Sequence, residues 1–448
     1  MLRNKGSSSK SLQEIWRCSM PSTEVVVTGM GLVSPLGLNL TQNWENFQAQ
    51  KTGIGHFPAG DRPVFTQYLG RVGGAELPAD IPGKLANQVR FLSQGSRLGL
   101  GAAREALAHA APDLNRIPPG RRALYLASGD LTQVGYAFLY PAMAESTSGK
   151  FEQIDSERLN EATLARVNPF FLLESIANNL FSFASAYLSF MGTNTSVASL
   201  SPCGAHALEL AARSIQDGHA DIAMAIACGS WINEVPLLEM SGLGLLSRCR
   251  QGVASFRPLD RRRDGFIPGE GAAALVLESA ENARERGAPI YASLRGFGNA
   301  TTVSETDSWS VPERVSEQSM RAAIEEAGCD LSDLAFWCPH GSGTVKGDRS
   351  ELHSIMAVTS PHSEPPRVSA LKAYTAHLGA ASDLAEIIFC TQALTQHLVP
   401  GTLNFQDADA EFARLVIAAH HQRTDKRLFL STSYGLLGQS SSVVVRVP

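Results

Sequence analysis

Residues that could perform acyl-transfer chemistry occur in three places along the chain, and the first is Ser201. An apolar, β-prone run ends at this serine, and a helix-patterned run begins near Ala205. A strand–turn–helix elbow exposes a nucleophile at the end of a strand, and the helix amino terminus favours developing negative charge. A serine hydroxyl is too weakly acidic for this dipole to ionise it. Ser201 therefore needs a general base, usually a histidine.

Ser201 also fits a purely structural role. Serine followed by proline at the start of a helix is typical of an N-cap with Pro202 at the first helical position. Proline also disfavours α geometry for the residue before it. Taken alone, this segment favours the cap over the nucleophile. Cys203 is expected inside the first helical turn, as a buried structural thiol pointing elsewhere.

Two isolated histidines lie far downstream. His340 follows a strand-like run and precedes a glycine-rich loop, whereas His377 follows Lys372 and precedes an apolar helix that contains Glu386. Each histidine alone is more typical of a structural position. The glycines after His340 lack the spacing of a phosphate-binding loop.

The composition excludes several functional classes. The 448 residues are 44% hydrophobic, which is enough for an extensive core. A net charge of −5 without a basic stripe argues against nucleic-acid binding, and seven scattered cysteines argue against a disulfide framework or a zinc site. The longest apolar stretch, residues 170–191, contains three strongly polar side chains, so we expect no membrane span. A cytoplasmic location is the simplest expectation.

Strand-like and helix-like runs alternate along most of the chain. Strands are expected at residues 24–30, 122–128, 195–200, 222–228, 272–277, 290–297, 334–338, 368–371, 428–433 and 442–447. Helices are expected at residues 94–111, 170–189, 204–217, 316–327 and 380–396. This alternation predicts an α/β fold with a mostly parallel sheet covered on both faces.

The same patterns divide the chain into three parts. Residues 1–20 are basic and serine-rich, and we interpret them as an N-terminal extension that is expected to be disordered. Residues 21–280 and 281–448 have a comparable α/β design. Because no long linker separates them, we expect the two halves to pack as one body.

In combination, these residues resemble the β-ketoacyl-acyl carrier protein synthases of fatty-acid and polyketide biosynthesis. The likeness runs from about residue 24 to residue 447. It rests on residues 25–31 (VVVTGMG), 34–37 (SPLG), 168–171 (NPFF), 257–271, 339–344 (PHGSGT) and 372–377 (KAYTAH). The resemblance implies a thiolase-like fold, in which two similar halves form a five-layered α-β-α-β-α body. It also implies a dimer.

The resemblance also implies a chemistry. In this family a cysteine takes an acyl group from a carrier-protein thioester, and two histidines help to decarboxylate a malonyl unit on a second carrier. His340 and His377 would donate hydrogen bonds to the malonyl carbonyl, while Lys372 and Glu386 would hold the network around the second histidine. The substrates would arrive on the phosphopantetheine of an acyl carrier protein, and no bound cofactor is expected.

The chain departs from the family pattern in its acyl-binding half. Counting back from residues 204–206, the position of the family's cysteine falls on Ser201, not on Cys203. In the carboxyl-terminal motif, Leu436 replaces a gatekeeping aromatic residue and Leu437 replaces a glycine. The candidate residues for substrate binding or gating are Leu436, Leu437, Thr344 and Glu386.

Three interpretations remain open at this stage. In the first, Ser201 is acylated and passes the acyl group on. In the second, the histidine pair decarboxylates malonyl-carrier protein without a covalent step. In the third, the chain is a non-condensing, chain-length-factor-like subunit. That subunit would pair with a cysteine-bearing ketosynthase, whereas an active chain could form a homodimer.

Overall fold

The structure, a computed structural model, describes residues 23–58, 66–74, 77–129, 138–150, 152–171, 178–198, 201–304, 311–359 and 364–448. The expected extension over residues 1–20 lies outside these residues, as does part of the helix predicted over residues 170–189.

Strands from both halves of the chain join into one sheet. β1 (Val25–Val33) connects the halves, because it pairs with β7 (Glu270–Ser279) on one side and with β8 (Ala292–Thr301) on the other. The other strands are β4 (Arg122–Ser128), β5 (Asn194–Ala198), β6 (Ile222–Ser230), β9 (Leu334–Cys338), β10 (Arg367–Val368), β12 (Val416–Ile417), β14 (Leu428–Tyr434) and β15 (Gln439–Arg446). Their order in the sheet is β12-β10-β9-β14-β15-β8-β1-β7-β6-β4-β5.

The predicted strands are present, but the prediction of a mostly parallel sheet is wrong. Every pairing from β14 across to β6 is antiparallel, and only the outer strands on either side pair in parallel. The pairing of β14 with β15 is antiparallel because a short turn joins them. The antiparallel direction of the central strands was not predicted because β1, β6 and β7 are buried along their whole length. They therefore lack the apolar–polar alternation that is typical of an antiparallel sheet with one face exposed to solvent.

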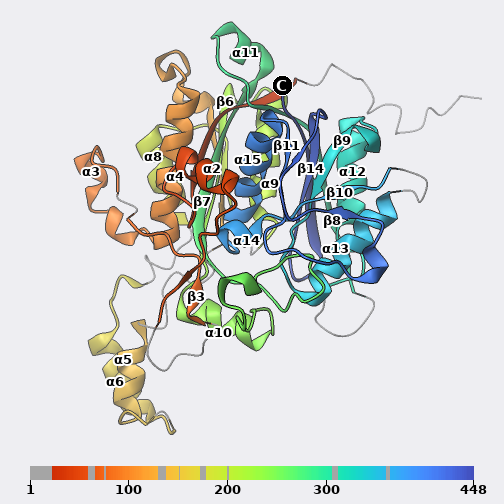
Figure 1. Ribbon diagram of the computed structural model, residues 1–448. Helices are drawn as coiled ribbons and strands as arrows, with labels where there is room; N and C mark the ends of the chain where they lie inside the picture. Colours follow the sequence, from red (N-terminus) through yellow and green to blue (C-terminus); the bar gives the residue numbers. More distant parts are fainter. Residues whose placement is uncertain are drawn as a thin grey trace, which may run out of the picture.

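Helices complete five layers (Figure 1). The outer face of the first half is covered by α4 (Gln94–Ala110) and α8 (Asn178–Leu188). The outer face of the second half is covered by α12 (Glu317–Ala327) and α13 (Val345–Val358). Between the two halves lie α9 (Cys203–Gln216) and α15 (Ala381–Thr395). This confirms the predicted thiolase-like layering.

The central helix α15 is buried on nearly all sides because small and large apolar residues surround its axis. It nevertheless carries buried Ser382, Asp383 and Glu386. Buried polar groups are costly without partners, so these three indicate a polar site inside the molecule. No helix in the described ranges is both long and apolar enough to cross a membrane.

Three neighbouring strands deliver side chains to that interior site. His340 follows β9, Lys372 follows β10, and Ser433 lies near the end of β14. Because β9 is parallel to both β10 and β14, these three positions lie at the same edge of the sheet. The amino termini of α9 and α15 approach each other there, since a side chain on Gly204 would meet the carbonyl oxygen of Ala380 at 2.6 Å.

Candidate active site

The two histidines form a direct contact at the centre of the site. Their Nε2 atoms lie 3.1 Å apart, and the rings meet edge to face at 66°. Both side chains are buried, at 3% exposure each. Burial and the nearby Lys372 ammonium hold the pKa of each imidazole well below its usual range, and His377 lowers that of His340 further. Both rings are therefore neutral at pH 7.

Aromatic rings enclose this pair. Trp231 stacks on His377 with centroids 4.7 Å apart, and Phe266 contacts the same imidazole at 4.8 Å. Tyr434 lies edge-on to His340, also at 4.7 Å. The indole Nε1–H of Trp231 donates to the carbonyl of Gly129 at 3.1 Å, which fixes the stacked ring. These rings exclude water, and this explains why the charged imidazoles are disfavoured.

A buried ion pair holds the main chain of His340. Lys372, at the start of α14 (Lys372–Thr375), donates from Nζ to the His340 carbonyl at 2.6 Å and to both Glu386 oxygens at 2.9 and 3.0 Å. Burial raises the pKa of Glu386 to about 7, and Lys372 opposes that rise. The ion pair was expected around the second histidine. Instead, Nζ binds the main chain of the first, because β9 and β10 end side by side.

The backbone at His340 has a second anchor, Glu351 on α13. Its two carboxylate oxygens accept the N–H groups of His340 at 2.7 Å and of Gly341 at 2.8 Å. Gly341 has a φ of +54°, a conformation that suits glycine. The main chain therefore turns sharply just after the histidine, and Glu351 satisfies both N–H groups of that turn.

The backbone at Gly379 determines where the imidazole protons lie. Its N–H donates to Nδ1 of His377 at 3.2 Å. Since an N–H group can only donate, the proton of neutral His377 is on Nε2 and points at Nε2 of His340. The proton of His340 is then on Nδ1, which faces the hydroxyl of Ser433 at 3.4 Å. His340 thus presents an acceptor and His377 a donor at the contact.

The structure assigns the helix cap to a residue other than Ser201. α9 begins at Cys203, and its N-cap position is Pro202, so the predicted N-cap role of Ser201 is wrong. The N–H groups of Gly204 and Ala205 donate to the Asp383 carboxylate at 3.0 and 3.3 Å. This carboxylate of α15 satisfies the helix terminus from outside α9.

The turn at Ser201 that precedes α9, called the serine elbow below, lies beside the hairpin formed by β14 and β15. Ser201 is buried at 4% exposure, and a Cβ on Gly435 would lie 2.3 Å from its carbonyl oxygen. Cys203, in contrast, is fully buried in the hydrophobic core, as predicted for a structural thiol. Ser201 and Gly435 therefore pack main chain against main chain.

The proposed gating residues lie at the margin of this network. Leu436 and Leu437 form the turn between β14 and β15; Leu436 is half-buried and Leu437 is 58% exposed. Leu437 therefore points to solvent in this structure rather than filling space in the site. Thr344 is the N-cap of α13, where its hydroxyl accepts the N–H of Gly347 at 3.3 Å.

The structure thus brings His340, His377, Lys372 and Glu386 into one network. Sequence patterns missed the buried polar groups that complete it, namely Glu351, Asp383 and Ser433, and the ring of Trp231. One signal was available for Asp383, because it and Glu386 are the two carboxylates in a largely apolar helix.

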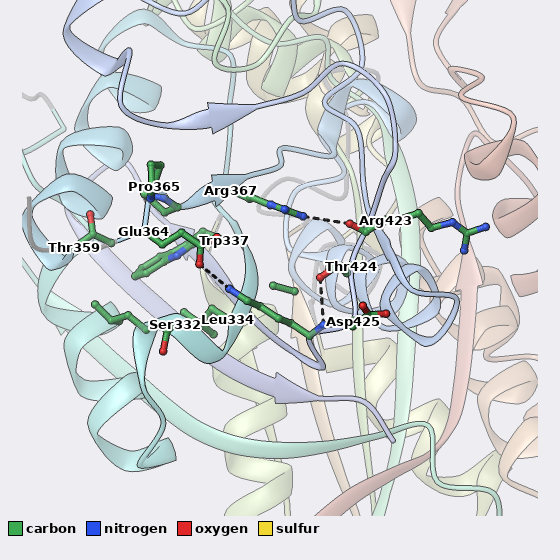
Figure 2. A pocket seen from close by; sticks show the side chains of 14 residues that line it. Ser332, Leu334, Trp337, Thr359, Glu364, Pro365, Arg367, Arg423, Thr424 and Asp425 are labelled. Atoms are coloured by element: carbon green, nitrogen blue, oxygen red, sulfur yellow. Dashed lines mark hydrogen bonds and ion pairs between the residues drawn. The ribbon is translucent and has the colours of Figure 1, made fainter. Parts of the chain in front are cut away.

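A separate cavity of about 500 Å³ is lined by residues from the start of β9, from β10 and from the segment before β14 (Figure 2). Trp337 is one of the lining residues, and Lys426 pairs with Glu364 at 3.1 Å. Arg367 reaches the carbonyl of Arg423 at 3.3 Å. The cavity sits near the amino ends of β9, β10 and β14, whereas the histidines follow the carboxyl ends. None of the predicted site residues lines it.

Comparisons with known proteins agree with this architecture. Residues 22–283 match the family model "Beta-ketoacyl synthase, N-terminal domain", and residues 291–406 match "Beta-ketoacyl synthase, C-terminal domain". The chain is 28% identical over 436 residues to 3-oxoacyl-(acyl-carrier-protein) synthase 2 of Vibrio cholerae, covering 95% of this chain and 100% of the relative. It is 26% identical over 423 residues to the protein of the same name in Staphylococcus aureus (strain COL), covering 94% of this chain and 98% of the relative.

Solved structures share the fold. A β-ketoacyl synthase from Burkholderia phymatum superposes with a TM-score of 0.76 at 25% identity, covering 95% of this chain and 100% of that one. A type II polyketide synthase acyl-carrier protein in complex with its ketosynthase gives 0.80 at 24% identity, and the ishigamide ketosynthase/chain length factor gives 0.77 at 23%. Both cover 95% of this chain and 100% of the other. Since the two domain models together match most of its length, the chain belongs to the β-ketoacyl synthase family.

Proposed function

We propose that this chain acts on acyl- or malonyl-carrier-protein thioesters, with Ser201 as acyl acceptor and the His340/His377 pair as the catalytic groups. The observation that carries the proposal is the buried, neutral pair with one Nε2–H donor and one Nε2 acceptor at 3.1 Å. A buried ion pair such as Lys372–Glu386 is weak evidence for stability alone. Its place under the His340 carbonyl supports a role in holding that histidine.

For acyl transfer, His340 supplies the base. Nε2 of His340 accepts the hydroxyl proton of Ser201 as the oxygen attacks the thioester carbonyl. The carbon–sulfur bond breaks, and the departing pantetheine sulfur takes up the proton that His340 accepted. An oxyester on Ser201 is a poorer electrophile than a thioester. Transfer to oxygen, sulfur or water is therefore favoured over carbon–carbon bond formation.

For decarboxylation, His377 supplies the donor. As carbon dioxide leaves the malonyl unit, the electron pair of the broken carbon–carbon bond moves into the thioester and forms an enolate. Nε2–H of His377 donates to the enolate oxygen. Protonation of the α-carbon by water then yields an acetyl-carrier protein.

Intact mass of the purified chain after incubation with acyl- and malonyl-carrier protein tests both steps. An adduct that is absent in Ser201→Ala, present in Cys203→Ala and resistant to neutral hydroxylamine identifies the serine oxyester, because thioesters are cleaved by that reagent. Release of carbon dioxide without an adduct, abolished in His377→Ala, assigns decarboxylation alone. Neither signal, from a folded chain, overturns the proposal.

A second candidate is a non-condensing subunit like a chain length factor, which would need a surface for a partner chain. The edge strand β5 has β4 as its only partner strand in the described residues, which leaves one edge available for another chain. Co-expression with a cysteine-bearing ketosynthase, followed by native mass spectrometry, distinguishes the two. A stable heterodimer in which this chain remains unacylated supports the subunit, whereas an acylated homodimer supports the enzyme.

A further inference from the structure

A buried carboxylate connects the serine elbow to the histidine pair. Asp383, on α15, is 2% exposed. Its Oδ2 accepts the N–H groups of Gly204 and Ala205, and its Oδ1 accepts the hydroxyl of Ser433 at 2.6 Å. The mechanism above makes no use of this residue, although it contacts both parts of the site.

The hydrogen-bond directions that follow from the Gly379 N–H favour the ionised form of Asp383. Because Gly379 fixes the proton of His377 on Nε2, His340 carries its proton on Nδ1 and donates to Ser433, which donates to Asp383. A protonated Asp383 that donated to Ser433 would reverse this chain. Two N–H groups would then face each other between the histidines at 3.1 Å.

The surrounding charges are compatible with a carboxylate. Burial raises the pKa of Asp383, while the Ser433 hydrogen bond, the Lys372 ammonium and the N–H of Ala205 lower it. His206, on α9, acts in the same direction as Lys372. Glu386, on the helix of Asp383, binds the Lys372 ammonium directly.

We propose that Asp383 is a positioning residue that adapts this site to a neutral hydroxyl at position 201. It links α9 to His340 through Ser433, and it places a negative charge on the helix terminus beside the serine elbow. This inference rests on the proposed function only in taking Ser201 as the nucleophile.

The physical consequence concerns a thiol at the same position. A helix amino terminus ordinarily lowers the pKa of an adjacent cysteine. Here the carboxylate of Asp383 already occupies the N–H groups of Gly204 and Ala205, and a like charge disfavours a second anion nearby. A cysteine introduced at position 201 is therefore expected to remain protonated at neutral pH.

Alkylation of resting protein tests this directly. The rate of reaction with iodoacetamide between pH 5 and pH 10 is measured for Ser201→Cys and for Ser201→Cys/Asp383→Asn, with the wild type as background for the other cysteines. In the single variant we expect a thiol pKa at or above about 8.5. In the double variant we expect it to fall by about one unit or more, with alkylation at pH 7 about tenfold faster.

A matched variant separates the charge from the link to His340. Ser433→Ala breaks that link but keeps the hydrogen bonds from the α9 N–H groups to Asp383. It should therefore change the histidine tautomers in ¹⁵N-histidine NMR spectra without lowering the thiol pKa of Ser201→Cys. Asp383→Asn should change both. If the asparagine variant does not fold, Asp383→Ser removes the charge and keeps an oxygen acceptor.

Two results overturn the inference: a thiol pKa below about 7 with Asp383 intact, or no change of that pKa on removing the carboxylate. Neither measurement uses a carrier protein. A raised thiol pKa therefore supports the positioning role of Asp383 even if no acyl adduct forms. Conversely, an acyl adduct can form even if Asp383 does not have this role.

Discussion

The ammonium of Lys372 lies 2.6 Å from the carbonyl oxygen of His340, so a buried cation from one strand end holds the main chain at the next. Glu386 balances that charge from the central helix. The position of His340 therefore depends on an ion pair that touches neither of its ring nitrogens.

Replacing Lys372 by methionine is expected to destabilise the fold by about 3–5 kcal/mol, because buried Glu386 loses its partner and must take up a proton, and the His340 carbonyl loses its hydrogen bond. Urea denaturation measures the loss. The double variant Lys372→Met/Glu386→Leu removes both charges and should lose less than the single variant. A single-variant loss below about 1 kcal/mol, typical of an exposed ion pair, would contradict this role.

Acidification below pH 6.5 is expected to destabilise the protein through His340 and His377. Both imidazoles are neutral when folded, because their pKa values lie well below 6.5, and both take up protons in the unfolded chain. Unfolding thus binds protons, and this part of the stability is lost as pH falls. Between pH 7.5 and pH 5.5 the two rings together account for up to about 2.7 kcal/mol.

Denaturation of the wild type and of His340→Gln/His377→Gln at these two pH values isolates the effect. The buried carboxylates have raised pKa values and act in the opposite direction, but they remain in both proteins. The double variant should therefore lose less stability on acidification. Equal losses in the two proteins would show that the rings are not held neutral.

Gly435→Ala is expected to displace the Ser201 turn, because the new Cβ would lie 2.3 Å from the Ser201 carbonyl oxygen, an impossible contact. The cost should be about 1–3 kcal/mol in a denaturation experiment, as for other overpacked positions. Leu437→Ala is the control in the same hairpin turn. Since Leu437 is exposed, its loss should stay within about 0.5 kcal/mol.

Trp231→Ala should raise the pKa of His377 toward its ordinary value, since the stacked indole at 4.7 Å is part of the wall that excludes water. Trp231→Phe keeps an aromatic ring and loses only the bond to Gly129, so it should leave that pKa nearly unchanged at a cost of about 1 kcal/mol. Titration of the histidine signals by NMR measures both. The same shift in the two variants would rule out shielding by the ring.

Local patterns were sufficient to predict most strands and helices and an α/β fold, whereas the five layers and the two histidine motifs came from the family resemblance. Burial and periodicity are properties of short segments, so β4 and β9 were predicted with the same bounds that they have in the structure. Strand direction in the central sheet was not predictable in this way. Strands buried on both faces have the same apolar pattern whether they pair in parallel or antiparallel.

By itself, the sequence determined the fold class and the identity of Ser201, His340 and His377 as the candidate chemical groups. Only the tertiary structure decided how they are connected. Asp383 caps α9 from 178 residues away, and Ser433 lies 93 residues from the imidazole that it contacts. These partners come together only when the layers pack and buried polar atoms form hydrogen bonds with one another. The spacing of the residues along the chain does not predict these contacts.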